Sequence, residues 1–178
     1  MPITPFHFGP GAAIKAVAPR HFGFTMFAFT NIVIDVEPLY FMAMGDWPIH
    51  RFFHTYAGAT VAAVACYFVG RPVCTWAIRV WNGRLNEAQA RWLAVEPRIA
   101  SLPAALGAAT GAWSHVLLDS LMHSDMQPLA PFSTESGQIH LVTIAQLELF
   151  CVLTGVLGIA ILLAAAILQR RRRDKGGS

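Results

Sequence analysis

Three residues of types that bind metals recur every four positions in the apolar stretch His115-Val-Leu-Leu-Asp119-Ser-Leu-Met-His123. In an α-helix, residues four and eight positions apart lie on one face. His50 and His54 repeat this spacing, which would place two imidazoles one helical turn apart. Ionisable side chains are costly in apolar surroundings and persist there mainly when paired, hydrated or bound to a metal. Imidazole and carboxylate are ligands of zinc and similar metals, so the two stretches predict a metal site.

The composition is that of a membrane protein. Of the 178 residues, 55% are hydrophobic and only 13% are charged, whereas soluble domains contain about 25% charged residues. The mean hydropathy of +0.49 points the same way. We expect a single helical membrane domain over residues 1–169 and a basic cytoplasmic tail over residues 170–178. The net charge of +3 comes from that tail, so we expect no direct binding of nucleic acid.

Four segments are apolar and long enough to cross a bilayer, which takes about 20 residues of helix. They cover residues 21–44, 53–69, 102–122 and 147–168. We therefore predict an all-α membrane bundle of about four transmembrane helices, with a short N-terminal helix and an amphipathic, interfacial helix within residues 76–98. Proline disfavours a helical conformation at the residue before it. The first segment is thus expected to break near Glu37 and restart at Pro38, and the second to stop at Gly70-Arg71-Pro72.

The basic residues predict the orientation of this bundle. The connection over residues 71–98 contains five arginines and the tail contains five cations, whereas residues 123–146 contain no lysine or arginine. Cytoplasmic segments of membrane proteins are enriched in these residues, so we predict a multi-pass protein whose C-terminus is cytoplasmic. The residues then expected near the outer end of the bundle are Asp35, Glu37, His50, His54, Asp119 and His123.

The residue types suggest a role for each candidate. The four expected metal ligands are His50, His54, His115 and Asp119. Asp35 would bridge or support them, because a carboxylate also serves to orient a ligand imidazole. Glu37 is the natural candidate for a general acid or base, although it could equally bind a metal. The sequence alone leaves open on which side of the membrane His7 lies.

The sequence lacks the motifs that are typical of several other classes of enzyme and binding protein. The chain contains no glycine-rich nucleotide-binding motif, no HExxH zinc motif and no GxSxG nucleophile motif,. Its three cysteines are scattered through apolar or amphipathic segments without a CxxC pair, so we predict no structural disulfide. A serine hydrolase is disfavoured, because Ser114 and Ser120 lie directly beside His115 and Asp119 and neighbours on a helix point about 100° apart.

Several short motifs, in order, resemble the family of membrane-bound metal-dependent hydrolases. They are His7 before glycines, Asp35 with Glu37, Pro48-x-His50-Arg51-x-x-His54-Thr55, and Ser114-His115-x-Leu117-Leu118-Asp119. Their order is also similar to that of the zinc-dependent phospholipase C and P1 nuclease group. The resemblance covers roughly residues 5–132. The chain departs from the family pattern at Phe52, where glycine is common.

This resemblance implies an α-helical protein of the inner membrane with hydrolase activity. It places the family's metal-site positions on His7, Asp35, His50, His54, His115 and Asp119. It does not extend to His123. The family is also associated with binding of the LexA repressor, and the sequence does not say whether such an association with a regulator holds here.

We therefore predict a membrane-embedded hydrolase that uses a divalent metal, most simply one or two zinc ions. Its expected substrate is a phosphoester or a lipid at the outer membrane face, because the predicted site lies at the level of the lipid headgroups. The alternatives from other classes are a metal-binding or transport protein without hydrolysis, a haem protein with paired histidines, and a structural membrane protein whose histidines are satisfied by hydrogen bonds. Metal content and a visible absorption spectrum would separate them.

Overall fold

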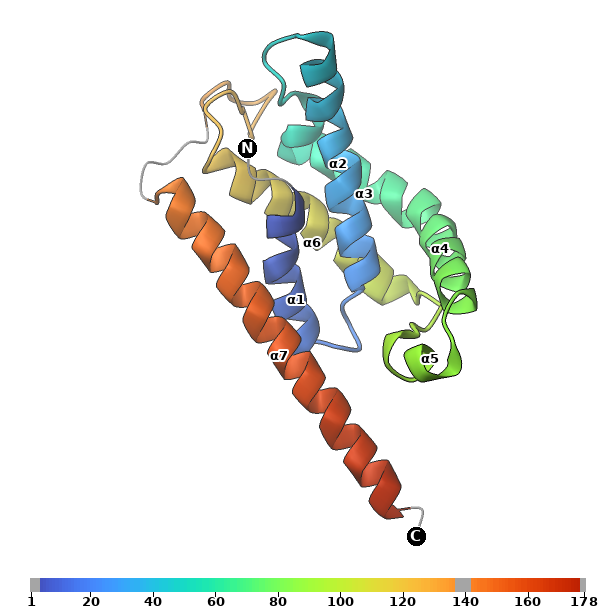
Figure 1. The fold of residues 1–178 in the computed structure, drawn as a ribbon. Coiled ribbons are helices and arrows are strands. Elements are labelled where there is room, and N and C mark those ends of the chain that lie inside the picture. The colour runs from blue at the N-terminus through green and yellow to red at the C-terminus, as the bar shows by residue number, and fades with distance from the viewer. Residues whose placement is uncertain (1–3, 137–141, 177–178) are drawn as a thin grey trace.

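The computed structural model describes residues 4–136 and 142–176, and they form an all-helical fold without a strand (Figure 1). The helices in chain order are η1 Thr4–His7, α1 Phe8–Val17, α2 Phe24–Met44, η2 Phe52–His54, α3 Tyr56–Ala65, η3 Cys66–Gly70, α4 Arg71–Gly83, α5 Glu87–Leu93, α6 Ser101–Ser120 and α7 Ile144–Gly176. Short 3₁₀ helices form η1 and η2, and η3 is a π-helical turn. The predicted all-α class is confirmed.

Within the described residues, three helical stretches are long and apolar enough to cross a membrane: Phe24–Met44, Tyr56–Gly83 and Ile144–Gln169. The last is the most apolar, with a mean hydropathy of 2.7, yet only 11% of its most apolar window is buried inside the protein. Apolar side chains that remain uncovered along a helix of this length suit contact with lipid. The composition and these helices are consistent with a membrane protein.

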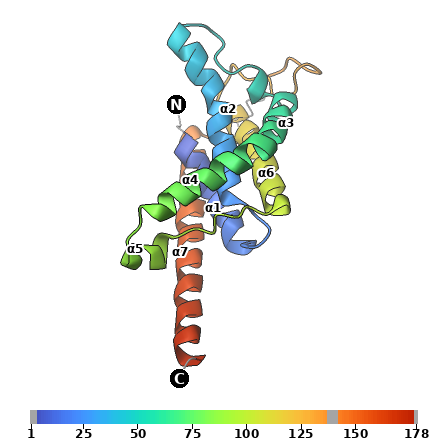
Figure 2. The same cartoon turned by 90° about the vertical axis from the view of Figure 1, so that its right-hand side faces the viewer.

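The predicted fourth transmembrane helix, α6, is not among these three. Its sequence is rich in alanine and glycine and also contains the histidine and aspartate of the candidate site. Half of its residues are buried, and it packs against both α2 and α3. The helix therefore serves as the central element of the bundle, whereas α7 lies at the edge and runs along α1 (Figures 1 and 2).

Two predicted helix ends are wrong. The helix α2 continues through Pro38, which is itself buried inside it. A proline in a helix interior removes one backbone hydrogen bond and costs about 3 kcal/mol, and the burial of the surrounding face, including Ile34, offsets this cost. The second segment likewise continues past Gly70-Arg71-Pro72 to Gly83, because the π-helical turn η3 precedes the proline and absorbs the irregularity,.

The segment predicted as one interfacial helix is divided between two elements. Trp76 to Gly83 belongs to α4, and a turn separates it from α5, which begins with a capping box formed by Asn86 and Gln89. The helix α5 buries none of its residues. Nε1 of Trp81 donates a hydrogen bond to the carbonyl oxygen of Leu93 at the end of α5, and Asn82 exchanges hydrogen bonds with the backbone of Val95 just beyond it.

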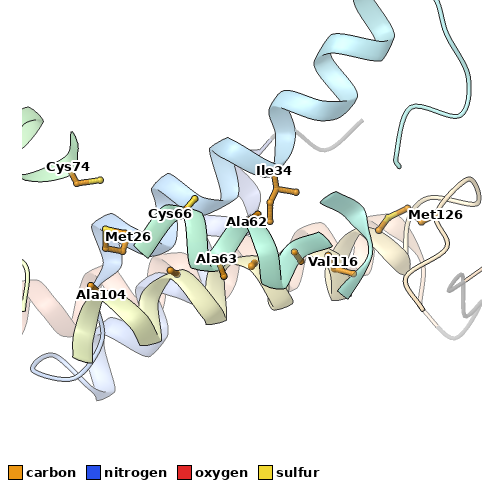
Figure 3. Packing of buried hydrophobic residues seen from close by; sticks show 12 residues of the cluster. Met26, Ile34, Ala62, Ala63, Cys66, Cys74, Ala104, Val116 and Met126 are labelled. Atoms are coloured by element: carbon orange, nitrogen blue, oxygen red, sulfur yellow. The ribbon is translucent and has the colours of Figure 1, made fainter. Parts of the chain in front are cut away.

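Small side chains allow α6 to approach its neighbours closely. Ala104, Ala108 and Ala112 follow one another at four-residue spacing and are almost fully buried. They belong to a core cluster that also includes residues of α2 and α3, seen close up in Figure 3. Close approach through alanine and glycine is the usual way for helices to associate within a membrane, where water supplies no driving force.

Glycine serves the same purpose where α1 meets α7. A methyl group added to Gly9 would collide with the carbonyl group of Cys151, and one added to Gly158 would collide with the backbone of Ala12. These glycines let the two helix backbones come into contact. Because His7 directly precedes α1, this contact also determines where the His7 side chain lies.

We expect Gly9→Ala to lower the free energy of unfolding by about 1–3 kcal/mol, because the added methyl group must push α1 away from α7. Thermal denaturation of the detergent-solubilised protein, followed by circular dichroism, measures the change. Gly83→Ala is the matched control, since nothing lies within 4 Å of the added carbon atom there. Equal stability of the two variants would contradict the close packing of α1 on α7.

Candidate metal centre

Three separate parts of the chain bring four potential metal ligands together. Asp35 comes from α2, His54 from the end of η2, and His115 and Asp119 from successive turns of α6. One ligand atom of each residue lies within 4.8 Å of the ligand atoms of the other three. The two histidines and Asp119 are buried, and Asp35 is partly exposed. These four residues are called the inner cluster below.

Asp119 lies at the middle of the cluster. Its Oδ2 atom is 3.3 Å from Nε2 of His115 and 3.7 Å from Nε2 of His54. Its Oδ1 atom is 2.9 Å from Nε2 of His7, although these two atoms do not form a hydrogen bond of acceptable geometry. Nε2 of His115 is also 3.2 Å from Oδ1 of Asp35. Nitrogen atoms of three imidazoles therefore surround the Asp119 carboxylate.

The orientation of the His115 ring follows from the residue that holds it. Nδ2 of Asn31 donates a hydrogen bond to the carbonyl oxygen of Phe27 at 2.8 Å, which fixes the orientation of the Asn31 amide. Oδ1 of Asn31 then faces Nδ1 of His115 at 3.0 Å. Because this oxygen can only accept, Nδ1 of His115 carries the proton in this pair. In a neutral His115 ring, the lone pair of Nε2 would then point at Asp35 and Asp119, as in a metal-ligating histidine,.

Glu37 holds His54 in the same manner. Its Oε2 atom accepts a hydrogen bond from Nδ1 of His54 at 3.0 Å. The backbone N–H groups of Arg51 and Phe53 donate to the same carboxylate at 3.0–3.1 Å. Glu37 thus ties the loop before α3 to α2 and leaves Nε2 of His54 facing Asp119.

Five buried side-chain nitrogen and oxygen atoms of the described residues lack a hydrogen-bond partner, and all belong to this site. They are both ring nitrogens of His7, Nε2 of His54, Nε2 of His115 and Oδ1 of Asp119. A buried polar atom without a partner costs about 1–3 kcal/mol, so native proteins rarely gather several at one place. A divalent cation would satisfy one nitrogen of each ring together with Oδ1 of Asp119, and it would balance the charges of Asp35 and Asp119. The donor set therefore fits a metal of the zinc type.

His7 reaches the site from the N-terminal end of the chain. It ends η1, is 2% exposed, and its ring stacks on that of His115 with 4.5 Å between the centroids. The start of α1 lies at the same end of the bundle as the end of α6 (Figure 1). The position of His7, which the sequence left open, is thus beside Asp119.

His50 lies next to the inner cluster, with its own carboxylate partner. Its ring is 4.8 Å from that of His54, and its Nδ1 atom is 2.9 Å from Oδ1 of Asp125. The backbone N–H groups of Ile49 and His50 point at Oδ2 of the same residue. Burial raises the pKa of Asp125, but the interactions with His50 outweigh this effect and hold the pKa below its ordinary value,.

Two expectations about helical spacing are wrong. His50 precedes the 3₁₀ helix η2, so His50 and His54 do not lie one turn apart on an α-helix. The helix α6 ends at Ser120, so His123 lies beyond it and does not extend the helix face that bears His115 and Asp119. Its backbone N–H still bonds to the carbonyl oxygen of Asp119 at 2.9 Å, and its ring stacks on His50 with 4.3 Å between centroids.

Sequence reasoning missed Asn31 and Asp125, the partners of His115 and His50. A signal for Asn31 is present, because it lies four residues before Asp35 on the same helix in an apolar run,. Asp125 lies two residues after His123 in a loop. Loop residues follow no helical or strand periodicity, so no spacing rule would bring it to His50.

Comparison with known proteins gives one match. Residues 1–177 match a family described as a domain of unknown function, DUF4184. Neither the curated proteins nor the solved structures contain a significant match to the chain. Because the match covers nearly the whole sequence, the chain belongs to the DUF4184 family.

Proposed function

We propose that this protein is a membrane-embedded, metal-dependent hydrolase whose metal centre is the inner cluster with His7 at its edge. The observation that carries the proposal is the convergence of buried, unpartnered atoms of His7, His54, His115 and Asp119 on one place. Two imidazole and two carboxylate ligands favour zinc, with manganese and iron as close alternatives. The similarity of the motifs to membrane-bound metal-dependent hydrolases supports the same reaction class.

When bound, a divalent cation supplies a Lewis acid that polarises a phosphoryl or carbonyl oxygen and lowers the pKa of water. The residues of the chain prepare the ligands for it. Glu37 and Asn31 each accept a hydrogen bond from Nδ1 of a ligand histidine and so hold Nε2 of His54 and of His115 in place. Such supporting partners typically raise metal affinity by about 10–100-fold.

Asp35 is the best placed group to accept a proton from a reacting water. Its side chain is 19% exposed, against 5% for Asp119. Glu37 is less suited to this role, because three donors already occupy its two oxygen atoms. In this proposal Asp35 is both a ligand and the catalytic base, and Glu37 is a positioning residue.

A cavity of about 400 Å³ is the proposed substrate site. None of the inner-cluster residues lines it, but its wall includes Arg51, Asp125 and His50, whose ring lies 4.8 Å from that of His54. A larger cavity of about 1030 Å³ has a mainly apolar wall from α1, α7 and residues 95–103, and it includes none of the inner-cluster residues. We propose a phosphoester, free or in a lipid headgroup, as the substrate class.

The proposed location is the inner membrane, with several crossings and a cytoplasmic C-terminus. The basic end of α7 lies at the opposite end of the molecule from the start of α1 and the end of α6, where the site is found (Figure 1). If the basic end is cytoplasmic, as the positive-inside rule requires, the centre faces the outer side of the membrane.

A second candidate is a protein that uses the cluster for stability alone. Nε2 of His115 lies within 3.3 Å of carboxylate oxygens from both Asp35 and Asp119. A doubly protonated His115 would form ion pairs with both, without any metal. Metal content decides between the two candidates.

We expect the detergent-purified protein to contain at least one equivalent of zinc, manganese or iron, measured by elemental mass spectrometry. The double variant His54→Ala/Asp119→Ala should lose the metal, because it removes two ligands of the inner cluster. His21→Ala is the control, since His21 is exposed and outside the cluster. Absence of metal from the wild type, even after reconstitution with each ion, would contradict the proposal and favour the structural role.

We expect Glu37→Gln to weaken metal binding by about 10–100-fold, because the amide group cannot accept all three hydrogen bonds that reach the carboxylate. Competition titration with a zinc chelator measures the affinity. Hydrolysis of bis(p-nitrophenyl) phosphate, a generic phosphodiester, should return to near the wild-type rate at saturating zinc.

The converse result would assign Glu37 a catalytic role. If Glu37→Gln binds zinc with wild-type affinity but does not hydrolyse the phosphodiester at saturating zinc, Glu37 is the general base and its assignment as a positioning residue is wrong. Glu148→Gln, which removes a carboxylate on α7 outside the cluster, controls for the loss of one negative charge.

A further inference from the structure

A second group of metal-ligand residues lies beside the inner cluster. His50, His123 and Asp125 each offer one ligand atom, and these three atoms lie within 4.8 Å of one another. His123 and Asp125 are partly exposed, in contrast to the three buried residues of the inner cluster. The three residues are called the outer cluster below.

The outer cluster repeats the arrangement of the inner one. Asp125 faces Nδ1 of His50, and a carboxylate oxygen only accepts, so Nδ1 carries the proton and the Nε2 lone pair of His50 is left available,. Glu37 and Asn31 act in the same way on His54 and His115. The His123 ring stacks on His50 with an interplanar angle of 29°, and it makes no hydrogen bond to any of the described residues. Two ring edges are thus available side by side.

The two clusters are joined through two short segments. His50 and His54 are separated by three residues, and so are Asp119 and His123. In each segment one member belongs to the inner cluster and the other to the outer cluster. The rings of His50 and His54 lie 4.8 Å apart, so the two clusters are immediate neighbours. Neither pair lies on one α-helix. The four-residue spacing instead places one member of each pair in the inner cluster and the other in the outer cluster.

We propose that the outer cluster binds a second divalent transition-metal ion through His50 and His123, with Asp125 holding the His50 ring in place, so that the protein contains a two-metal centre. This inference rests on the proposed function, because the second ion would act on the substrate together with the metal of the inner cluster. His50 and Asp125 also line the cavity of about 400 Å³, so the second ion is the one that an anionic phosphoester meets on entry. Two ions about 3.5–4 Å apart stabilise the attacking and leaving oxygens of a phosphoester.

Manganese loading tests the proposal. The purified protein is freed of metal with a chelator, reloaded with Mn²⁺ and analysed for metal content and by low-temperature electron paramagnetic resonance. We expect about two equivalents in the wild type, with the exchange-coupled spectrum of neighbouring ions. His123→Ala should retain about one equivalent and give the spectrum of an isolated ion, and His21→Ala should match the wild type.

Each other outcome overturns the proposal in a distinguishable way. One equivalent in both the wild type and His123→Ala would leave the inner centre standing and refute the outer ion. Loss of all manganese from a folded His123→Ala variant would place His123 in a single shared centre. No manganese in the wild type would refute both proposals. If His123→Ala fails to fold, as judged by gel filtration and circular dichroism, Asp125→Ala replaces it. This variant removes the acceptor that holds Nδ1 of His50, and about one equivalent is again expected.

Discussion

The structure depends on one buried carboxylate and the three imidazoles that surround it. Asp119 is 3% exposed, and its oxygen atoms lie 2.9, 3.3 and 3.7 Å from Nε2 of His7, His115 and His54. A carboxylate buried in this way is unfavourable unless charge or hydrogen bonds compensate it. The N-terminal segment, η2 and α6 must all meet at one end of the bundle to provide that compensation. The packing of the helices can be understood as the means of bringing these segments together.

The partners of the histidines explain why the site is rigid. Each of His54, His115 and His50 has its Nδ1 atom engaged by a different residue, which is Glu37, Asn31 and Asp125 respectively. All three partners are themselves held by backbone groups. Glu37 and Asp125 accept hydrogen bonds from nearby N–H groups, and Asn31 donates one to the carbonyl oxygen of Phe27. An imidazole held at one nitrogen can rotate little, so the other nitrogen keeps a fixed direction. This is what separates a prepared ligand set from a chance gathering of histidines.

The sequence predicts the residue types of the site better than their geometry. His54, His115 and Asp119 are recognisable because ionisable residues stand out in apolar segments, and the structure brings them together. The spacing argument assumed continuous α-helix, and it fails for His123 because α6 ends at Ser120. The helix break expected at Pro38 is also absent, because tertiary packing outweighs the local preference of proline to end a helix. The position of Asp125 depends on the path of a loop, and that of His7 depends on the contact of α1 with α7. No local sequence pattern encodes either feature.

The composition of α6 links the membrane character of the protein to its site. Its many alanine and glycine residues make α6 less suited to cross the membrane in contact with lipid. The same small residues let α2 and α3 approach its backbone,. At Gly111, a methyl group would collide with the backbone of Phe27 in α2. Asn31 lies one turn beyond Phe27 on α2, and His115 lies one turn beyond Gly111 on α6,. The hydrogen bond between Asn31 and His115 thus requires the close approach that Gly111 permits. The predicted transmembrane segment that is not among the three membrane-spanning candidates is therefore the helix around which a buried polar centre can form.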